Sequence, residues 1–450
     1  MTLNEYYDYI KDKNVGFLGL GRSNMPLIRL LAAKNVKITV RDKKERSALG
    51  DFLPSLDALG VKIISGGGYL AGIEEHDVIY KTPAIRPDLP ELIRAKEHGA
   101  TVTSEMELFF SLCPCKVFAV TGSDGKTTTT TLIYEMLKKE GCTCHLGGNI
   151  GRPLIGDIES IRPDDMAIVE LSSFQLFNMT ASPYAAVITN ISENHLDWHK
   201  DFDEYIGAKK NIFKNQCPGS VLVLNRDNSY TRAMEGEAKG SVRFFSLNEK
   251  TGGAYLEDGK IYYDGGYIMD KSDIILPGIH NTANYLAAIS AVRDFVSDET
   301  VRSVARTFGG VEHRIEFVRE KDGVSYYNDS IGSTPARTIA TLSAFPGKVI
   351  LIAGGYDKHL NYTELGRVIK DRVKFLVLIG ATSDKIESAA REAGFSAIVR
   401  AHSFEGAVLA ARDAALPGDK VVLSPASASF DMFRDFAERG KTFKNIVNGL

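Results

Sequence analysis

The residues best suited to chemistry form a glycine loop at residues 122–128, Gly-Ser-Asp-Gly-Lys-Thr-Thr. The loop follows the apolar run 116–121 and precedes a helix-compatible stretch, so we expect a strand, a loop and a helix. Such a junction favours phosphate, because backbone N–H groups surround the anion and Lys126 adds a full positive charge. Thr127 or Thr128 can offer a hydroxyl to Mg²⁺. The spacing is two residues shorter than the usual P-loop, which indicates a different nucleotide-binding family.

Two further reactive side chains follow apolar strands downstream of this loop. Glu170 ends the first of these strands, and His195 comes shortly after the second. Open α/β sheets hold ligands at the carboxyl ends of their strands, so we expect both side chains near Lys126. Glu170 is a candidate Mg²⁺ ligand, and His195 a metal ligand or a phosphate contact. Asn149, inside the glycine turn 147–151, either contacts a ligand or caps the next segment.

A second nucleotide-shaped site is expected near the N-terminus. Residues 19–21, Gly-Leu-Gly, are similar to a dinucleotide fingerprint, but Asn24 stands where the third glycine belongs. The next strand delivers Asp42 at the position of a ribose-binding acid, and Lys43 and Lys44 beside it suit a phosphate. This pattern alone leaves a dehydrogenase and a different nucleotide binder open.

Polar loops also follow the strands of the C-terminal third. Four apolar strands separated by helical stretches are expected at residues 325–327, 349–353, 375–379 and 421–423. This alternation predicts a doubly wound, mainly parallel sheet. The loops after three of these strands, residues 328–330, 354–358 and 424–430, should face one cleft. In it Lys358 and Ser429 can hold a carboxylate, and Asp329 a ribose hydroxyl or a metal.

The length of 450 residues predicts about three α/β domains. We place them at residues 1–104, 105–310 and 311–450. Residues 241–275 alternate apolar and polar positions, which predicts antiparallel strands appended to the central domain. Asn281 lies at the start of a long helix, where it either caps the helix or hydrogen-bonds a base. By composition alone, Lys209 would be a surface charge.

Composition excludes several classes of protein. Hydrophobic residues at 44% and charged residues at 25% are ordinary for a globular chain, and the net charge of −3 argues against nucleic-acid or membrane partners. No apolar stretch is long enough to span a membrane, and the first residues lack the pattern of a signal peptide. We therefore expect a cytoplasmic protein. The five cysteines are expected to be free thiols, since the two Cys-x-Cys pairs have gaps too short for zinc.

Taken together, the motifs resemble the Mur ligase family. The loop at 122–128, Gly-Asn-Ile-Gly at 148–151, Glu-Asn-His-Leu-Asp at 193–197 and His-Asn-x-x-Asn at 280–284 are similar to the family at large. Residues 170–176 and 423–433 resemble the D-glutamate-adding member. The resemblance implies a Rossmann-like N-terminal domain for the UDP part of the substrate and a central P-loop ATPase-type domain. It also implies a Rossmann-like C-terminal domain that binds D-glutamate and closes over ATP.

The resemblance further implies a reaction. An ATP-dependent ligase would join D-glutamate to UDP-N-acetylmuramoyl-L-alanine through an acyl phosphate, giving ADP and phosphate, in cytoplasmic peptidoglycan precursor biosynthesis. Two Mg²⁺ ions would offset the charge of the crowded phosphates and carboxylate. The partners would be small molecules, and the enzyme would act as a monomer.

The residue roles that the resemblance implies fall into three sets. For ATP they are Gly122, Ser123, Asp124, Gly125, Lys126, Thr127, Thr128, Asn281, Arg314 and Asp329. For the metal ions and catalysis they are Lys126, Thr127, Glu170, His195 and Lys209, the last as a carbamoylated lysine. For the substrates they are Ser23, Asp42, Lys43, Lys44 and Thr82 around the uridine nucleotide, Asn149 at the muramoyl part, and Lys358, Ser429, Phe430, Phe436 and Ser333 around D-glutamate.

Two positions depart from the family pattern. Ile331 stands where many relatives have lysine, and Asp124 replaces a common asparagine. The alternatives are a sibling ligase that adds another amino acid, a folate polyglutamylating ligase, an NAD-dependent dehydrogenase built on residues 19–21, and a non-catalytic nucleotide-binding regulator. Asn24, and the lack of a catalytic constellation downstream of residues 19–21, count against the dehydrogenase.

Overall fold

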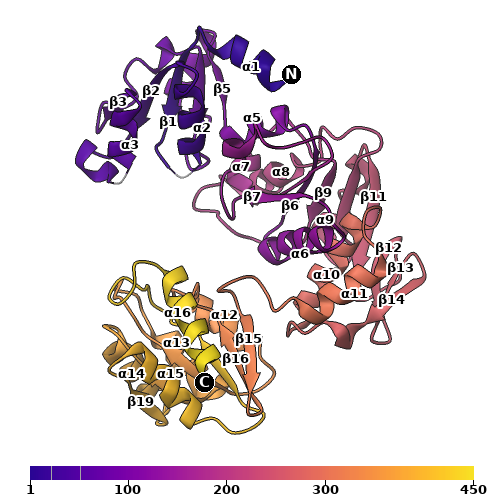
Figure 1. Cartoon of the computed structure of the whole chain (residues 1–450), viewed down its shortest axis with the longest axis vertical. Helices are drawn as coiled ribbons and strands as arrows, with labels where there is room; N and C mark the ends of the chain where they lie inside the picture. Colours follow the sequence, from indigo (N-terminus) through magenta and orange to yellow (C-terminus); the bar gives the residue numbers. More distant parts are fainter. Residues whose placement is uncertain (22, 51) are drawn as a thin grey trace. The chain divides into compact units, whose positions relative to one another are not determined.

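The chain forms an α/β protein with three sheets, which confirms the expected fold class. A computed structural model describes residues 1–21, 23–50 and 52–450 (Figure 1). The chain divides into two compact units, the first comprising Met1–Lys271 with Thr282–Val304 and the second Ser272–Asn281 with Ala305–Leu450. The first unit holds two of the sheets, and the second unit holds the third.

The N-terminal sheet is parallel throughout. Its strand order is β3 (Lys62–Ser65), β2 (Lys37–Asp42), β1 (Asn14–Leu18), β4 (Val78–Lys81) and β5 (Thr101–Thr103). The helices of this region are α1 (Leu3–Ile10), α2 (Asn24–Ala32), α3 (Phe52–Ala58) and α4 (Pro90–Glu97). The edge strand β3 was not expected from the sequence, because its apolar run is only two residues long; Lys62 is exposed and the other three residues are half-buried.

The central sheet has nine strands. The order is β14 (Gly266–Asp270), β13 (Lys260–Tyr263), β12 (Gly253–Glu257), β11 (Ser241–Ser246), β10 (Val221–Asn225), β9 (Ala185–Ile188), β6 (Lys116–Thr121), β8 (Met166–Glu170) and β7 (Cys144–Gly148). Its helices are α5 (Glu105–Leu112), α6 (Lys126–Lys139), α7 (Ser173–Leu176), α8 (Phe202–Lys210), α9 (Ser229–Arg232), α10 (Ile279–Val292) and α11 (Asp298–Thr307).

The appended strands are antiparallel only in part. β11 pairs parallel with β10, and β12 pairs parallel with β11; only β12, β13 and β14 form an antiparallel meander. The expectation of antiparallel pairing across residues 241–275 was therefore wrong for β11. Alternation of apolar and polar residues indicates a half-exposed strand, but it does not determine whether the neighbouring strand runs parallel or antiparallel.

The two sheets of the first unit share one hydrophobic core. It extends from Tyr6 and Phe17 of the N-terminal region to Phe213 and Phe244 of the central region. No separation in packing therefore marks the predicted boundary at residue 104, which stays a prediction. In the described part of the chain, no helix has the length and apolar character needed to cross a membrane.

The C-terminal sheet carries helices on both faces. The strand order is β15 (Glu316–Lys321), β16 (Val324–Asn328), β20 (Lys420–Leu423), β17 (Val349–Ala353), β18 (Val373–Leu378) and β19 (Ile398–Arg400). Residues of α12 (Pro335–Ser343), α13 (Thr363–Arg372) and α14 (Ser383–Glu392) form one core, and those of α15 (Phe404–Asp413) and α16 (Phe436–Gly449) form the other. This two-sided packing is the predicted doubly wound arrangement.

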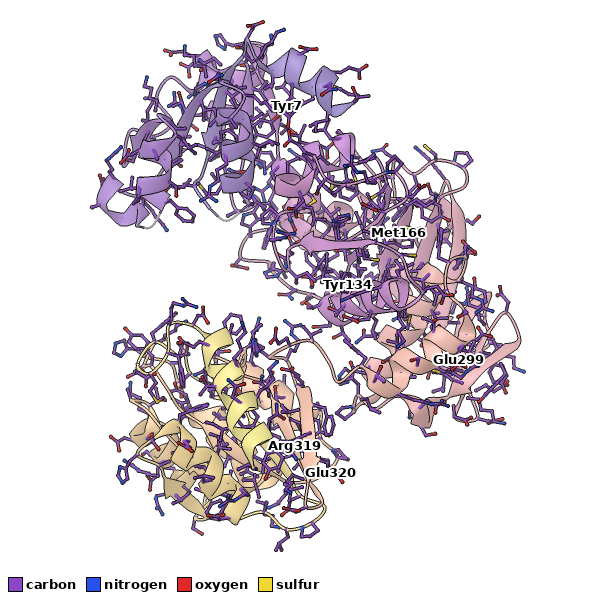
Figure 2. All side chains as sticks on the ribbon, in the orientation of Figure 1. Tyr7, Tyr134, Met166, Glu299, Arg319 and Glu320 are labelled. Atoms are coloured by element: carbon purple, nitrogen blue, oxygen red, sulfur yellow. The ribbon has the colours of Figure 1, made fainter. Side chains whose placement is uncertain are left out.

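Two edge strands of this sheet were not expected. β15 pairs antiparallel with β16, and β19 is only three residues long. β15 contains four charged residues among six, so its sequence lacks an apolar strand signal. Its Arg319 instead fastens the edge to the end of α16, where Nη1 donates to the carbonyl of Asn448 at 2.9 Å (Figure 2).

Candidate active site

The loop between β6 and α6 has the backbone conformation that its two glycines permit. Gly122 has φ +149°, and a Cβ there would lie 1.9 Å from Thr189 Oγ1. Gly125, which precedes the first turn of α6, has φ +77°, in the left-handed region. A side chain at either position would strain the backbone and collide with a neighbouring group, so glycine is strongly favoured at both. The predicted strand, loop and helix are confirmed.

Thr127 and Asn149 converge on the carboxylate of Glu170. Thr127 Oγ1 donates to Glu170 Oε2 at 2.6 Å, and Asn149 Nδ2 donates to Glu170 Oε1 at 2.6 Å. Glu170 is only 2% exposed, at the end of β8. The charge is therefore held by two neutral donors beside the glycine loop. Of the two candidate threonines, Thr127 is the one in contact with this carboxylate.

Lys126 starts α6 and folds back over the loop. Its Nζ donates to the carbonyl of Gly122 at 3.0 Å and to that of Ser123 at 2.9 Å. Ser123 is itself fixed, because its Oγ donates to the carbonyl of Ser192 and lies 2.9 Å from Tyr205 Oη. The ammonium thus stays at the mouth of the loop, where an anion would meet it.

Lys209 of α8 is buried behind the same loop and is not a surface charge. It is 2% exposed, and its Nζ donates to the Gly122 carbonyl at 2.8 Å and to Thr121 Oγ1 at 3.3 Å. Burial, and then the positive charge of Lys126, hold the pKa of Lys209 well below its usual range. The neutral amine is therefore favoured, and this is the nucleophilic form of a lysine.

His195 lies in the loop after β9 and is exposed. Its backbone has φ +55°, and its ring lies 4.9 Å from the ring of Phe174. Partial burial lowers the pKa of His195; the carboxylate of Asp197 opposes this shift, and the positive charges of Lys126 and Lys209 add to it. The structure therefore places Lys126, Glu170 and His195 in one region and favours a neutral imidazole.

Asn284 contacts the start of α6 and was not among the predicted site residues. Thr129 Oγ1 donates to Asn284 Oδ1 at 3.3 Å, and a Cβ on Gly125 would meet the same oxygen at 2.3 Å. The sequence motif at 280–284 pointed to this helix, but we had singled out Asn281. Asn281 and Asn284 are three residues apart and therefore lie on one face of the helix, and this spacing would have indicated Asn284.

A cleft of about 540 Å³ adjoins Glu170. Its walls come from the glycine turn after β1, the loop after β4, the turn after β7 and the start of α7, with Ser23, Thr82, Asn149, Ser172, Gln175 and Trp198 among the lining residues. Asn149 thus lines the cleft and hydrogen-bonds Glu170. The cleft and the glycine loop therefore meet at one carboxylate.

The predicted uridine contacts fall into two groups. Ser23 and Thr82 line the cleft, whereas Asp42, Lys43 and Lys44 do not. Asp42 is 7% exposed and accepts hydrogen bonds from the backbone N–H groups of Leu20 at 2.6 Å and Lys44 at 2.8 Å. In this structure Asp42 fixes the glycine turn, and the two lysines are exposed at the strand end.

Arg86 joins the two regions that form the cleft and was not predicted. Its guanidinium makes a bidentate pair with Glu204, each bond 3.0 Å, and donates to the Trp198 carbonyl at 2.8 Å. It also lies 4.9 Å from the centre of the Trp198 ring. Trp198 Nε1 in turn donates to the Ala84 carbonyl at 3.0 Å. These bonds link the loop after β4 to the segment that carries Trp198 and Glu204, and they stabilise the cleft wall.

In the second unit, the loops after β16, β17 and β20 meet as expected. Gly354 N donates to the Pro425 carbonyl at 2.8 Å, and Tyr356 N donates to the Ala428 carbonyl at 2.9 Å. Ala426 N donates to the Gly332 carbonyl, also at 2.8 Å. These bonds bring the three predicted loops to one sheet edge, because β20 lies between β16 and β17.

The residues predicted to contact D-glutamate differ in their exposure to solvent. Ser429 is buried, whereas Lys358 and Ser333 are more open and Phe430 and Phe436 are 60% and 40% exposed. Lys358 Nζ lies 5.8 Å from the centre of the Phe430 ring. The structure thus places a cation over an exposed aromatic ring at the loop edge.

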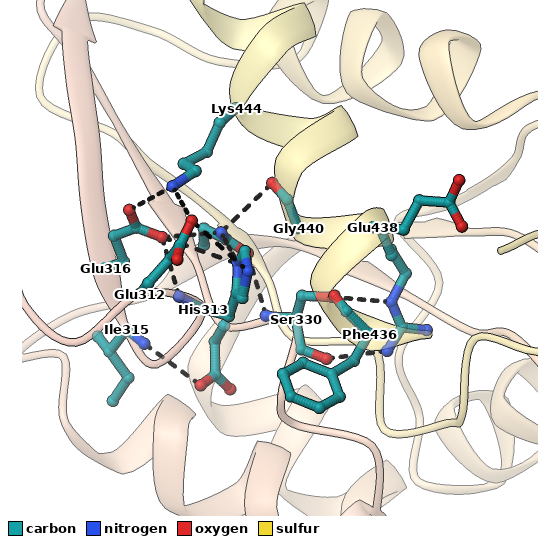
Figure 3. Close-up of polar contacts among 12 residues, drawn as sticks. Glu312, His313, Ile315, Glu316, Ser330, Phe436, Glu438, Gly440 and Lys444 are labelled. Carbon is teal, nitrogen blue, oxygen red and sulfur yellow. Dashed lines mark hydrogen bonds and ion pairs between the residues drawn. The ribbon is translucent and has the colours of Figure 1, made fainter. Parts of the chain in front are cut away.

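Arg439 holds this loop cluster together and was not predicted. It is 1% exposed; its Nη2 donates to the Ser330 carbonyl at 2.9 Å, and its Nη1 donates to the Ala428 carbonyl at 3.1 Å. Nearby, Lys444 of α16 bridges Glu312 at 2.8 Å and Glu316 at 2.9 Å (Figure 3). These ties anchor α16 beside the loops.

Asp329 has both carboxylate oxygens engaged. Oδ2 accepts from Thr341 Oγ1 and Ser424 Oγ, each at 2.7 Å, and Oδ1 accepts from Ile315 N at 3.3 Å. Burial raises the pKa of Asp329 to about 6. Its predicted ribose or metal contact stays a prediction. Asn281 Nδ2 donates to the Pro277 carbonyl at 2.7 Å, and its expected contact with a base likewise stays a prediction.

Comparisons with known proteins bear on this site. Residues 120–292 match the Mur ligase middle domain, and residues 313–427 match the Mur ligase, glutamate ligase domain. A UDP-N-acetylmuramoylalanine--D-glutamate ligase from Clostridium botulinum is 51% identical over 455 residues, which cover 100% of this chain and 99% of that protein. One from Acetivibrio thermocellus is 52% identical over 462 residues, with the same coverage.

Solved structures show the same fold at low identity. The UDP-N-acetylmuramate-alanine ligase from Thermotoga maritima has a TM-score of 0.57 at 17% identity, covering 97% of this chain and 99% of that chain. MurF from Acinetobacter baumannii has a TM-score of 0.58 at 13% identity, with coverage of 98% and 92%.

Proposed function

The chain belongs to the Mur ligase family, and from this premise we propose that it joins D-glutamate to UDP-N-acetylmuramoyl-L-alanine, using ATP. Relatives that carry this activity in their names are about half identical over the full chain. The geometric observation that supports the proposal is Glu170, whose two oxygens accept from Thr127 of the glycine loop and from Asn149 of the cleft. A phosphate donor and an acceptor would therefore lie side by side.

The proposed chemistry has two steps. An oxygen of the L-alanine carboxylate attacks the γ-phosphorus of ATP, the bond to ADP breaks, and an acyl phosphate forms. The amine nitrogen of D-glutamate then attacks the acyl carbon, phosphate leaves, and the nitrogen loses a proton to give the amide. In the first step Lys126 and the backbone N–H groups of the glycine loop would hold the phosphates in line with the cleft.

The residues near the loop fit the Mg²⁺ ions that the family implies. Glu170 and Thr127 offer a carboxylate and a hydroxyl, the hard oxygen donors that Mg²⁺ prefers, and His195 lies in the same region. Among the described residues no cluster of three or more His, Cys, Asp or Glu side chains could hold an ion, so phosphate oxygens and water would supply the other ligands. When bound, Mg²⁺ offsets the negative charge of the phosphates and of the attacking carboxylate.

Lys209 is proposed to carry a carbamate. Its neutral amine would add to CO₂, forming an N–C bond and releasing one proton, and the resulting anion could bind Mg²⁺ where an ammonium would repel it. Burial without a carboxylate partner supports this role, because the charged lysine is disfavoured there. NMR of protein kept in ¹³C-bicarbonate should show a carbamate signal that Lys209→Met lacks and the neighbouring control Lys210→Met retains. No signal in the wild type would refute the modification.

The remaining proposed roles are contacts with the substrates and with ATP. We propose that Ser23 and Thr82 contact the uridine nucleotide in the cleft, and that Lys358, Ser429 and Phe430 contact D-glutamate. Asp42, Lys43, Lys44, Asn281, Arg314, Asp329, Ser333 and Phe436 keep their predicted substrate or ATP roles as part of this proposal. Since all the proposed site residues lie in one chain and the reaction needs ATP, we propose a monomer that acts in the cytoplasm.

The decisive experiment measures phosphate release with each component omitted in turn. Release should require ATP, Mg²⁺, UDP-N-acetylmuramoyl-L-alanine and D-glutamate together, and Lys126→Ala should lose it. L-Alanine, L-lysine and diaminopimelate in place of D-glutamate test for a sibling activity. Stimulation by one of these amino acids, with none by D-glutamate, would overturn the proposed specificity.

A further inference from the structure

A second, smaller pocket of about 320 Å³ lies in the first unit. Its lining comes from the ends of β4 and β5, the start of α5, and the segment from α7 to residue 180. It shares Pro83, Phe174 and Gln175 with the larger cleft, and its other lining residues are separate. The two cavities are therefore neighbours with a common wall, and none of the predicted substrate residues lines the smaller one.

Lys81, the last residue of β4, lines this pocket. Its neighbour Tyr80 belongs to the main core of the unit, and Ile79 to the small core on the other face of the sheet. Because strand side chains alternate, Lys81 lies on the Ile79 face. The residue is only 6% exposed, and the described chain offers its ammonium no hydrogen bond or ion pair.

A buried ammonium without a partner is costly, and proteins normally pair it. Among the described lining residues, Glu107 alone carries a carboxylate, and this group accepts from the backbone N–H groups of Thr180 at 3.1 Å and Ala181 at 3.2 Å. The exposed Lys96 of α4 adds a second positive charge that acts on Lys81. The pocket thus has a positive end at Lys81 to which no carboxylate of the described residues is paired.

The rest of the lining indicates the size and kind of ligand. Thr103, Ser104 and Asn178 supply polar groups, whereas Pro83, Val102, Phe174 and Met179 supply apolar walls. An inorganic ion would fill little of this volume and leave the apolar walls unused. The carboxylate of Glu107 also disfavours a ligand with two negative charges. We propose that the Lys81 pocket binds a small organic monocarboxylate, independently of the substrate cleft.

The ligand should change the titration of Lys81 itself. Burial, and then the charge of Lys96, lower the pKa of Lys81 to about 8. A bound carboxylate favours the ammonium, and an opposite charge at 4–6 Å shifts a pKa by about 1–3 units. The midpoint should therefore rise by about one unit or more when the site is saturated.

Butyrate is the probe, and the full-length protein labelled with [¹³Cε]lysine is the sample. The Lys81 signal is identified by its absence in Lys81→Met, and its midpoint is followed with butyrate and with chloride at equal ionic strength. Butyrate should raise the midpoint, also when UDP saturates the cleft.

In calorimetry at pH 7, Lys81→Met should bind butyrate about tenfold or more weakly than the wild-type protein, because a charged hydrogen bond is lost. The exposed control Lys96→Met should stay within about twofold.

Three results would overturn the proposal. The first is a titration midpoint of Lys81 that does not move with butyrate in the wild-type protein; this result does not depend on the folding of any variant. Alternatively, UDP would abolish the shift, which would assign the pocket to the nucleotide site. The third is a rise of the midpoint with sulfate that equals the rise with butyrate at the same concentration. The pocket would then not require a ligand with a hydrocarbon part.

Discussion

Replacing Gly125 by alanine tests the packing of the glycine loop directly. Gly125 has φ +77°, and an L-residue held in this left-handed region costs about 1–2 kcal/mol. The added Cβ would also lie 2.3 Å from Asn284 Oδ1, well inside contact distance. Asn284 must then move, and its hydrogen bond with Thr129 would break.

The expected loss can be summed from these two parts. Thr129 is fully buried, so breaking its 3.3 Å bond to Asn284 removes the acceptor of a buried hydroxyl, which costs about 1–3 kcal/mol. With the backbone strain, Gly125→Ala should destabilise the unit by about 2–5 kcal/mol. ATP affinity should fall as well, because the loop is displaced.

Urea unfolding followed by fluorescence measures this change. The chain has a single tryptophan, Trp198, and it lies in the unit that contains the loop. Gly141→Ala is the matched control: Gly141 has φ +104° and no atom within 4 Å of a built Cβ, so it should lose only the backbone term of about 1–2 kcal/mol. In an Asn284→Ala background, Gly125→Ala should cost no more than this control.

Equal losses for Gly125→Ala and Gly141→Ala would refute the proposed collision. So would a Gly125→Ala penalty that stays unchanged after Asn284 is truncated, since the two sites would then act independently. Either result would mean that the loop relaxes without displacing Asn284.

Three further predictions concern the same unit. Glu170→Gln removes the charge between loop and cleft, and phosphate release at saturating substrates should fall about 100-fold or more; a near-normal kcat would exclude a direct role. Arg86→Lys loses the bidentate pair and the stacking on Trp198, so the KM for the UDP substrate should rise about tenfold with little change for ATP, and the fluorescence of Trp198 should shift. Burial, and then the charge of Arg41, lower the pKa of His76 to about 4, so the unfolded chain takes up the proton first as pH falls. Stability should therefore drop by about 2–3 kcal/mol between pH 6.5 and pH 4, and His76→Gln, which keeps an acceptor for Arg41, should flatten this part of the pH profile.

Much of the candidate site was predictable because its signals are local. The loop at 122–128 needs glycine where the backbone is left-handed or closely approached, and a lysine at the first helical turn, all within seven residues. Glu170 was predictable because it ends an apolar strand. The three loops of the C-terminal sheet were predictable because strand ends of a doubly wound sheet share one edge.

The residues that were missed act through partners far away in the sequence. Arg86 meets Glu204, Asn284 meets Thr129, and Arg439 meets Ser330. Arg86 and Arg439 have no distinctive neighbourhood along the chain, whereas Asn284 belongs to the motif at 280–284 and only its contact with Thr129 was hidden. The parallel pairing of β11 belongs to the same class, since alternation shows that a strand forms but not which neighbour it finds.

Lys209 and Lys81 illustrate the limit of local reasoning. Lysine side chains are mostly exposed in folded proteins, and neither residue has neighbours in the sequence that predict otherwise. In the structure they are 2% and 6% exposed, and burial lowers the pKa of both. Their chemistry therefore changes only once other parts of the chain cover them.

The order of residues alone was enough to define the phosphate loop, the α/β class and the strand ends that carry polar groups, because backbone conformation and periodicity depend on near neighbours. Folding decided which side chains meet across the sheets, which lysines lose their water, and how the walls of the cleft are fastened. These properties depend on distance in space and on the local dielectric environment, and both are set only when segments far apart in the chain pack together.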